Sequence, residues 1–253
     1  MHLLTGVERG SMNQRKTLLA ISFLALLLPA VACSQATRLG LASTDGLRLH
    51  NVAAQAVTFK GHAAVRLAVA PEITGRPEYI AGQVEPEAFA WINGLQFSNG
   101  VIEAEIAASP AEGAYPGARG FVGIAFRLQT DRPPSQPQVY DAFYLRPTNG
   151  RADDQERRNR AVQYISHPEW TWQRLRRDTP AKYESYVDLV PDTWTKIRIE
   201  VRGAQAKLYV HDQPQPVLIV NDVKSGSAAS GAVALWIGPG TVAHFRNLLV
   251  TPW

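Results

Sequence analysis

The chain has 253 residues, a formal net charge of +4 and a single cysteine. A balance this weak, without a clustered basic patch, argues against nucleic-acid binding, so no nucleic-acid partner is expected. One cysteine excludes an internal disulfide, and the length fits one domain of β-sandwich size.

Residues 1–32 have the pattern of a secretory signal peptide. Arg15 and Lys16 precede an apolar run that ends in small residues at Ala32. Cys33 follows directly, in the position of the lipid-acceptor cysteine of bacterial lipoproteins, and the sequence leaves lipid anchoring and simple cleavage open. We therefore expect an extracytoplasmic protein, either secreted, periplasmic or an outer-membrane lipoprotein, that meets a membrane only through such an anchor.

Residues 33–44 are predicted to form a short linker, and residues 45–253 a single, monomeric domain. This part of the chain is a series of short strand patterns with turn residues between them, typical of an all-β sandwich or barrel. The predicted strands are 47–52, 56–61, 62–70, 88–98, 100–108, 121–129, 139–147, 161–167, 193–203, 205–213, 216–222, 231–238 and 242–252. Short helices are expected within 153–160 and 170–177.

Several predicted strands alternate between apolar and polar residues. Residues 101–107 and 195–202 both place aliphatic side chains on one face and charged ones on the other. Such alternation indicates strands with one buried and one solvated face.

Two neighbouring strands, 121–129 and 139–147, offer a candidate binding face. On the side opposite its apolar set, the first strand carries Gly123, Ala125 and Arg127. The corresponding side of the second strand carries Tyr140, Ala142, Tyr144 and Arg146. A tyrosine ring offers an apolar platform with a hydroxyl at its edge, and arginine adds a fork of donors, a combination that suits a sugar. A solvated sheet face is the alternative interpretation.

The segment between this strand and the next is rich in charges of both signs. It is either a hydrated loop or the rim of the candidate site. Its predicted contributions are Asn149, Arg151, Asp154 and Arg158. Calcium could bind Asp153 or Asp154, although no calcium-loop pattern is present and no cofactor or metal site is predicted.

No nucleophile motif stands out, so general acid–base groups are the remaining catalytic candidates. The predicted catalytic residues are His167, Asp154 and Glu184. The predicted substrate-binding residues are Arg127, Tyr140, Asp141, Tyr144, Arg146, Asn149, Arg151, Arg158, Gln163, Tyr164 and Trp170.

The order of the strands, with the phrases "WTKIRIEVRGAQAKLYV" and "FRNL", resembles the concanavalin A-like jelly roll, notably laminin-G-like domains and the 3-keto-disaccharide hydrolase domain. The resemblance covers roughly residues 45–252 and implies a two-sheet antiparallel β-sandwich whose concave face binds or cleaves glycans. The sequence lacks the E-x-D-x-E strand motif of related β-glucanases, which puts their mechanism in doubt.

The resemblance to the 3-keto-disaccharide hydrolase domain implies a different chemistry, in which a ketone acidifies the neighbouring C–H bond. His167 or Asp154 would then act as the base, and Arg127, Arg146 or Tyr144 would stabilise the enolate. The alternative function is a non-catalytic carbohydrate-binding or adhesion module of the cell envelope. A purely structural envelope protein is the third possibility.

Overall fold

The computed structural model describes residue 6 and residues 35–253 except 134. Apart from residue 6, the predicted signal peptide lies outside the described residues, as does Cys33. Residues 35–253 form one compact unit whose regular secondary structure is mostly β-strand. None of the helices in the described residues is long and apolar enough to cross a bilayer.

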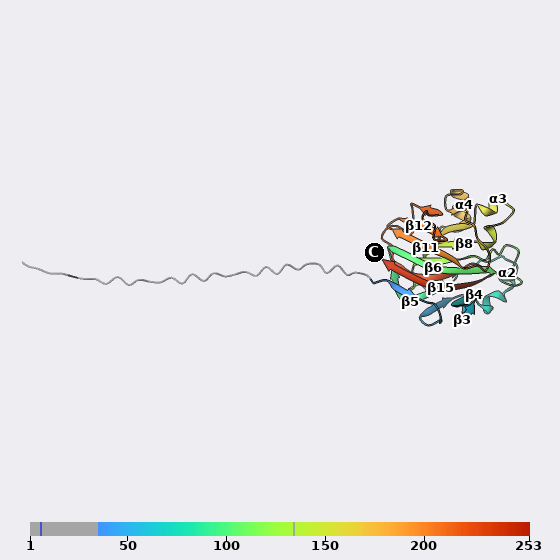
Figure 1. Ribbon diagram of the computed structural model, residues 1–253, viewed down its shortest axis with the longest axis horizontal. Helices are drawn as coiled ribbons and strands as arrows, with labels where there is room; N and C mark the ends of the chain where they lie inside the picture. The colour runs from blue at the N-terminus through green and yellow to red at the C-terminus, as the bar shows by residue number, and fades with distance from the viewer. Residues whose placement is uncertain (1–5, 7–34, 134) are drawn as a thin grey trace, which may run out of the picture. The chain divides into compact units, whose positions relative to one another are not determined.

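The domain consists of two antiparallel sheets. In the first, the order is β13 (Leu218–Val220), β12 (Gln205–Val210), β11 (Thr195–Arg202), β6 (Gly100–Pro110), β15 (Thr241–Pro252), β4 (His62–Val69) and β3 (Val52–Phe59), and β1 (Thr37–Leu39) also pairs with β15. Figure 1 shows β11, β6, β15 and β4 lying side by side in this order. The pairing of β1 extends the sandwich into the stretch predicted to be a linker.

The second sheet has the order β10 (Glu184–Ser185), β9 (Val162–His167), β8 (Tyr140–Leu145), β7 (Val122–Leu128), β14 (Gly231–Ile237), β5 (Ala88–Phe97) and β2 (Leu47–His50). The predicted all-β, two-sheet sandwich is therefore confirmed. Neighbours in both sheets are often far apart in sequence, as in β14, which pairs with both β5 and β7.

The apolar faces of the two sheets form the core between them. In β6, Ile102, Ala104 and Ile106 are buried, and the intervening Glu103 and Glu105 are half-buried. Residues of β11 alternate in the same way, and Ile199 lies opposite Ile102 in the pairing of β11 with β6. The sequence pattern predicted these faces correctly because each of the two strands has one buried face and one face toward solvent.

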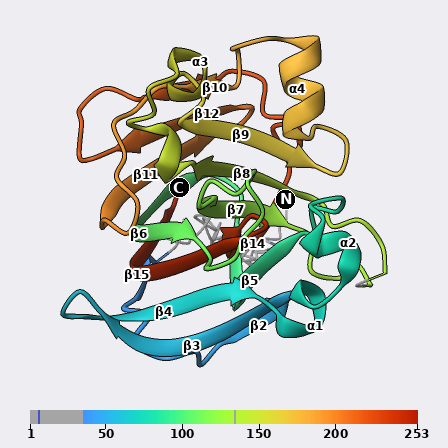
Figure 2. The same ribbon diagram turned by 90° about the vertical axis from the view of Figure 1, so that its right-hand side faces the viewer.

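Short helices surround the outer face of the second sheet. The structure contains α1 (Pro71–Thr74), α2 (Pro77–Ile80), η1 (Pro147–Asn149), α3 (Gln155–Arg158) and α4 (Trp172–Asp178). Figure 2 shows α3 and α4 near β9 at one margin of this sheet, with α1 and α2 toward β5 at the other. Helices α3 and α4 fall within or beside their predicted ranges, whereas α1 and α2 were not predicted.

Candidate functional site

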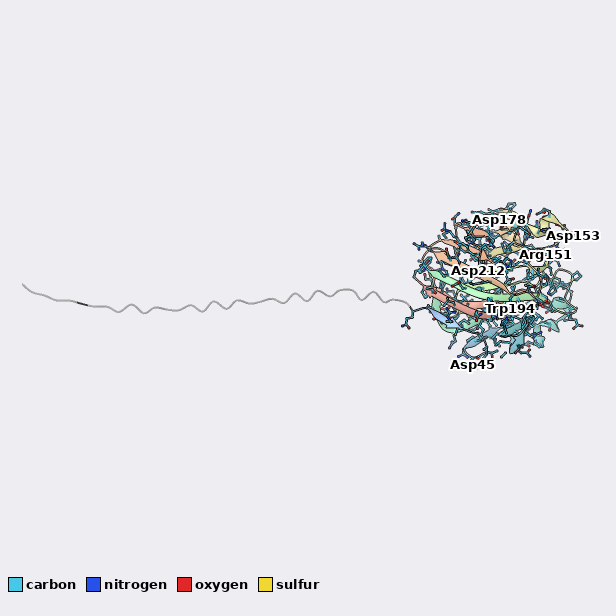
Figure 3. All side chains as sticks on the ribbon, viewed as in Figure 1. Asp45, Arg151, Asp153, Asp178, Trp194 and Asp212 are labelled. Atoms are coloured by element: carbon cyan, nitrogen blue, oxygen red, sulfur yellow. The ribbon has the colours of Figure 1, made fainter. Side chains whose placement is uncertain are left out.

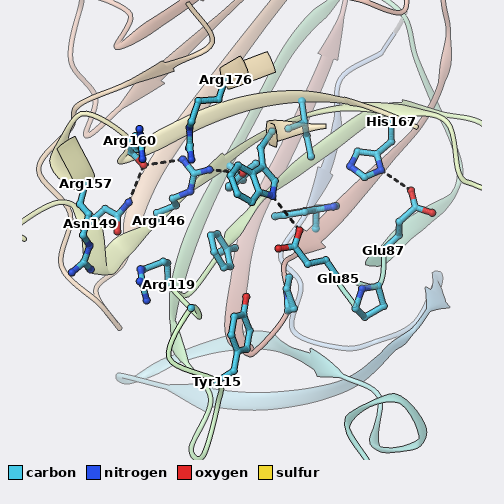
Figure 4. A pocket seen from close by; sticks show the side chains of 18 of the residues that line it. Glu85, Glu87, Tyr115, Arg119, Arg146, Asn149, Arg157, Arg160, His167 and Arg176 are labelled. Atoms are coloured by element: carbon cyan, nitrogen blue, oxygen red, sulfur yellow. Dashed lines mark hydrogen bonds and ion pairs between the residues drawn. The ribbon is translucent and has the colours of Figure 1, made fainter. Parts of the chain in front are cut away.

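A pocket of about 330 Å³ lies on the outer face of the second sheet. Its floor comes from β8, β9 and β14, and its walls come from the segments before β5, before β7 and after β8 and β9. Figure 4 shows arginines gathered on one side and His167 with two glutamates on the other. The lining residues are Glu85, Pro86, Glu87, Tyr115, Gly117, Arg119, Phe121, Tyr140, Tyr144, Arg146, Asn149, Arg157, Arg160, Ile165, His167, Trp172, Arg176, Trp236 and Pro239.

Aromatic rings form the floor of the pocket. Trp236 packs on Tyr144, with ring centroids 4.8 Å apart, and its Nε1 donates a 3.1 Å hydrogen bond to the hydroxyl of Tyr140. Gly123 lies between Trp236 and Tyr144 in the strand pairing, which lets the two large rings meet. Burial raises the pKa of Tyr144 to about 12 and that of Tyr140 well above its usual value. Both hydroxyls are therefore protonated at neutral pH and can donate.

Arg146 is held rigidly beside this floor. Its Nη2 donates to the Tyr144 hydroxyl at 2.8 Å and to Gln163 Oε1 at 3.1 Å, and its Nη1 donates to the carbonyl of Arg160. Register explains the contact, because Gln163 pairs with Tyr144 on the next strand. Burial lowers the pKa of Arg146, and the nearby phenol and Glu184 act against that change.

Glu184 is a counterion for three arginines. Its carboxylate lies 2.8 Å from Arg176, 3.5 Å from Arg160 and 4.0 Å from Arg146, and its side chain is 8% exposed. It does not line the pocket. The sequence analysis predicted Glu184 to be an acid–base group. In the structure its carboxylate instead forms ion pairs with the three guanidiniums.

His167 and Glu87 form a pair on the opposite side of the pocket. The His167 Nδ1 lies 3.0 Å from Glu87 Oε1, and the imidazole stacks on Tyr140 with centroids 5.0 Å apart. The other oxygen of Glu87 accepts a hydrogen bond from the backbone N–H of Gln138. A carboxylate on Nδ1 fixes the ring and favours the tautomer that leaves Nε2 free to take a proton.

Helix α4 supplies a second aromatic wall. Thr171 caps its N-terminus by accepting from the backbone N–H of Arg174, and Trp172 is the first helical residue. The Trp172 Nε1 donates to Glu85 Oε2 at 3.1 Å, which links the helix to the segment before β5. The guanidinium of Arg176, one helical turn later, lies 4.7 Å from the centre of the Trp172 ring.

One side of the pocket, called the arginine side below, is lined by Arg119, Arg146, Arg157, Arg160 and Arg176. The segment before β7 closes this side. Arg119 Nη1 donates to the carbonyls of Pro116 and Ala118 at 2.6 and 2.8 Å. Burial raises the pKa of Tyr115 in the same segment to about 12, with a further contribution from Glu85. Its hydroxyl is therefore also a donor at neutral pH.

Five of the residues predicted from sequence line this pocket. They are Tyr140, Tyr144, Arg146, Asn149 and His167. Gln163 and Glu184 support them from just behind the lining. The strand-face argument therefore located the pocket, because residues two apart on β8 share its outer face.

The sequence analysis placed Arg127, Asp141 and Tyr164 at the binding site, but the structure buries them and none of them lines the pocket. The Tyr164 hydroxyl donates to Asp141 Oδ1 at 2.6 Å inside the sandwich, and Ser225 donates to the other oxygen of Asp141. Tyr164 pairs with Phe143, so both point into the core. Arg127 donates to Ser225 and to backbone carbonyls in the same interior cluster.

A β-bulge explains the error at Arg127. Between Ala125 and Leu128 the strand β7 has one residue more than the facing stretch of β14, and Arg127 has a φ of 56°. The extra residue reverses the alternation at this point, which turns the Arg127 side chain into the sandwich. Nothing in the strand's alternating pattern predicted the bulge.

The remaining predicted residues lie outside the pocket. Asp154 is exposed and caps α3 by accepting from the backbone N–H of Arg157 at 2.8 Å, so the structure does not bring it to the pocket as the sequence analysis expected of a base. Arg151, which is labelled in Figure 3, is exposed and pairs with Asp188 at 2.7 Å. Arg158 donates to the hydroxyl of Tyr186, and the Trp170 ring lies against Arg174 and Lys224.

The prediction from sequence missed much of the lining, notably Glu85, Glu87, Arg119, Trp172 and Trp236. Trp236 could have been found, because it follows Ala232 and Ala234 on one face of β14, the same small-residue pattern that singled out β7. The two glutamates and Arg119 come from loops that carry no such periodicity.

The assembled groups could bind a polar ring and exchange protons with it. Aromatic rings offer stacking surfaces, five arginines offer donors, and the His167–Glu87 pair offers a general base. Within the described residues no cluster of three or more His, Cys, Asp or Glu side chains could hold a metal ion. The candidate calcium position at Asp153 and Asp154 stays a prediction.

No family model and no curated protein matches the sequence. Two solved structures from Bacillus subtilis resemble this chain. The carbohydrate-binding module CBM66 is 13% identical, with a TM-score of 0.51, and the match covers 81% of this chain and 95% of that one. A protein of unknown function with a galectin-like fold is 15% identical, with a TM-score of 0.55, over 85% of this chain and 94% of that one. With its two antiparallel sheets, the described domain has the concanavalin A-like jelly-roll fold expected from the sequence.

Proposed function

We propose that this pocket binds a carbohydrate. The observation that carries the proposal is the combination of a Trp236–Tyr144 floor and a Trp172 wall with arginine, asparagine and glutamate groups around one cavity. Sugars present C–H faces that pack on aromatic rings and hydroxyls that need hydrogen-bond partners. The volume of about 330 Å³ lies within the range of small-ligand pockets.

The likeness to a structure named as a carbohydrate-binding module supports this choice of ligand. An extracytoplasmic location, as expected from the N-terminal sequence, would expose the pocket to glycans outside the cytoplasm. The monomeric state, the lipid anchor and the lack of nucleic-acid binding stay predictions.

Two tryptophans on either side of the start of α4 provide a matched test. Trp172 lines the pocket, whereas Trp170, also partly exposed, does not. In a glycan array followed by calorimetry, Trp172→Ala should weaken binding by about fivefold, because losing an aromatic contact costs about 1 kcal/mol. Trp170→Ala should bind like the wild type. If no glycan binds the wild type, or if both variants bind equally well, the pocket is not the carbohydrate site.

The His167–Glu87 pair favours a second function, glycoside cleavage, in particular of a 3-keto-glycoside. The 3.0 Å contact with Glu87 would hold the His167 ring in the orientation and tautomer that leave Nε2 free to accept a proton. A hydroxyl of Tyr144 and the guanidinium of Arg146, joined at 2.8 Å, would donate to the enolate oxygen.

In this reaction His167 takes the proton from the ring carbon next to the ketone. The electron pair of that bond forms a carbon–carbon double bond, and the glycosidic C–O bond breaks with its pair going to the leaving oxygen. The leaving group departs with the proton that His167 held, and water then adds across the double bond. The net result is hydrolysis, without a carboxylate nucleophile.

Turnover distinguishes the enzyme from a non-catalytic binding module. His167→Ala should bind a 3-keto-glycoside and fail to cleave it, and Glu87→Gln should retain binding while reducing the rate. Lys224→Ala, outside the pocket, serves as the control. Wild-type protein that binds the glycoside without any turnover would contradict the enzymatic function and leave the binding function in place.

A further inference from the structure

The arginine side of the pocket carries far more positive charge than its own carboxylates balance. Five arginines line the pocket, and within the described residues those on this side pair with only two acidic side chains, Glu184 and Glu156. Five guanidiniums against two carboxylates leave an excess of three positive charges. Glu85 and Glu87 lie across the pocket, where they contact Trp172 and His167 (Figure 4).

Arg119 and Arg157 account for most of this excess. Among the described residues neither has a carboxylate within 4.0 Å, whereas Arg146, Arg160 and Arg176 share Glu184. Arg119 donates only to backbone carbonyls, and Arg157 Nη2 reaches the carbonyl of Thr148 at 3.5 Å. The two guanidiniums repel each other: burial lowers the pKa of Arg119, and the charge of Arg157 lowers it further.

Arg157 also keeps an unused donor. Its Nε is buried and has no hydrogen-bond partner among the described residues. A buried donor without a partner costs about 1–3 kcal/mol, which a ligand oxygen would recover. The Nε and Nη groups of a guanidinium form a planar fork that matches the two oxygens of a carboxylate or sulfate.

We propose that this pocket selects an acidic sugar, and that Arg119 and Arg157 bind its carboxylate or sulfate group. The inference rests on the proposed carbohydrate-binding function and specifies its ligand class. The sugar ring packs against Trp172 and the Trp236–Tyr144 floor, and its anionic substituent extends toward the arginine side. A neutral sugar would leave the excess positive charge without a partner.

The test compares each neutral sugar with its uronate and its 6-O-sulfate on one array, followed by calorimetry with the best-bound series. The wild type should bind the acidic members at least about tenfold more tightly than the neutral one. Raising sodium chloride from about 50 to 500 mM should weaken acidic binding several-fold and leave neutral binding unchanged, since salt screens charge. Preference for the uronate would identify a carboxylate as the bound group, and preference for the sulfated sugar would identify a sulfate.

Matched arginine variants locate the subsite. Arg157→Met should abolish the acidic preference while retaining neutral binding, and Arg158→Met, the adjacent arginine outside the pocket, should change neither. Arg157→Lys should restore part of the preference, since it keeps the charge and loses the fork. Equal binding of acidic and neutral sugars by the wild type would overturn this inference while leaving carbohydrate binding intact. Absence of any sugar binding would overturn the proposed function itself.

Discussion

Replacing Arg127 with methionine tests whether the bulge in β7 turns this side chain into a structural element. Arg127 is 1% exposed and donates five hydrogen bonds, two of them to the carbonyl of Ser98. The other three go to the carbonyls of Gly203 and Gly226 and to the hydroxyl of Ser225. The guanidinium thus joins β7 to three other segments of the chain, and methionine keeps its unbranched shape without any donor.

The expected loss follows from these acceptors. Each buried acceptor that loses its donor costs about 1–3 kcal/mol, although Ser225 would keep its bond to Asp141. Asp141, which is fully buried, would also lose the positive charge near it. Removing one charged member of a buried network costs about 3–5 kcal/mol. We therefore expect Arg127→Met to lower the free energy of unfolding by about 3–5 kcal/mol.

Urea unfolding followed by tryptophan fluorescence measures this change, with Arg151→Met as the control. Arg151 pairs with Asp188 at 2.7 Å, but both side chains are at least half exposed. Such surface pairs contribute about 0–1 kcal/mol, so this variant should unfold close to the wild type. Arg127→Met with wild-type stability and impaired glycan binding would show that the side chain faces the pocket, and the bulge argument would fail.

Three further changes should alter stability. In Gly123→Ala, the new Cβ would meet the backbone of Phe143 and lie 2.6 Å from Tyr144 Cα. We therefore expect the free energy of unfolding in urea to fall by about 1–3 kcal/mol and glycan binding to weaken. Unchanged stability and binding would contradict the close packing of the pocket floor. Burial raises the pKa of Asp222, but hydrogen bonds from Lys224, Tyr183 and Lys182 outweigh it and hold the pKa at about 2. This stabilisation is present above about pH 4 and is lost as the pH falls toward 2. Because the side chain is 39% exposed, Asp222→Asn should cost only about 1 kcal/mol at pH 7, and the difference from wild type should shrink in acid. Burial lowers the pKa of His244, and the charge of Arg66 adds to this, so the folded state favours the neutral imidazole. Stability should therefore fall as the pH drops below about 6.5, and His244→Phe, which can keep the stacking on Phe59, should flatten that dependence in denaturation midpoints measured between pH 5 and 8.

The β-sandwich could be predicted because the alternation of apolar and polar residues is visible within each single strand. Alternation along β6 and β11 identified a dry and a wet face, and the same rule placed Tyr140, Tyr144 and Arg146 together on one side of β8. Where a strand keeps its period of two, side-chain direction follows from sequence alone.

The rest of the site could not be predicted for two physical reasons. Glu87 and His167 are 80 residues apart in the chain, and their segments meet only because β5 and β9 belong to the same sheet, in which β8, β7 and β14 lie between them. The bulge at Arg127 depends on the register between β7 and β14, which one strand's own sequence does not carry. Long-range pairing and register decide both features.

Arginines on the two faces of the second sheet show how partners decide the role of a side chain. Inside the sandwich, the five N–H donors of Arg127 all bond to four acceptors of the protein. This guanidinium therefore stabilises the fold and has no donor left for a ligand. On the outer face, Arg146 is likewise fixed by Tyr144, Gln163 and a carbonyl. Arg157 retains a buried Nε without a partner among the described residues, and its guanidinium has no carboxylate within 4.0 Å among them. Under the proposal of an acidic sugar, the ligand would supply the acceptor that this Nε lacks, so the arginine side, more than the aromatic floor, would decide which sugar binds.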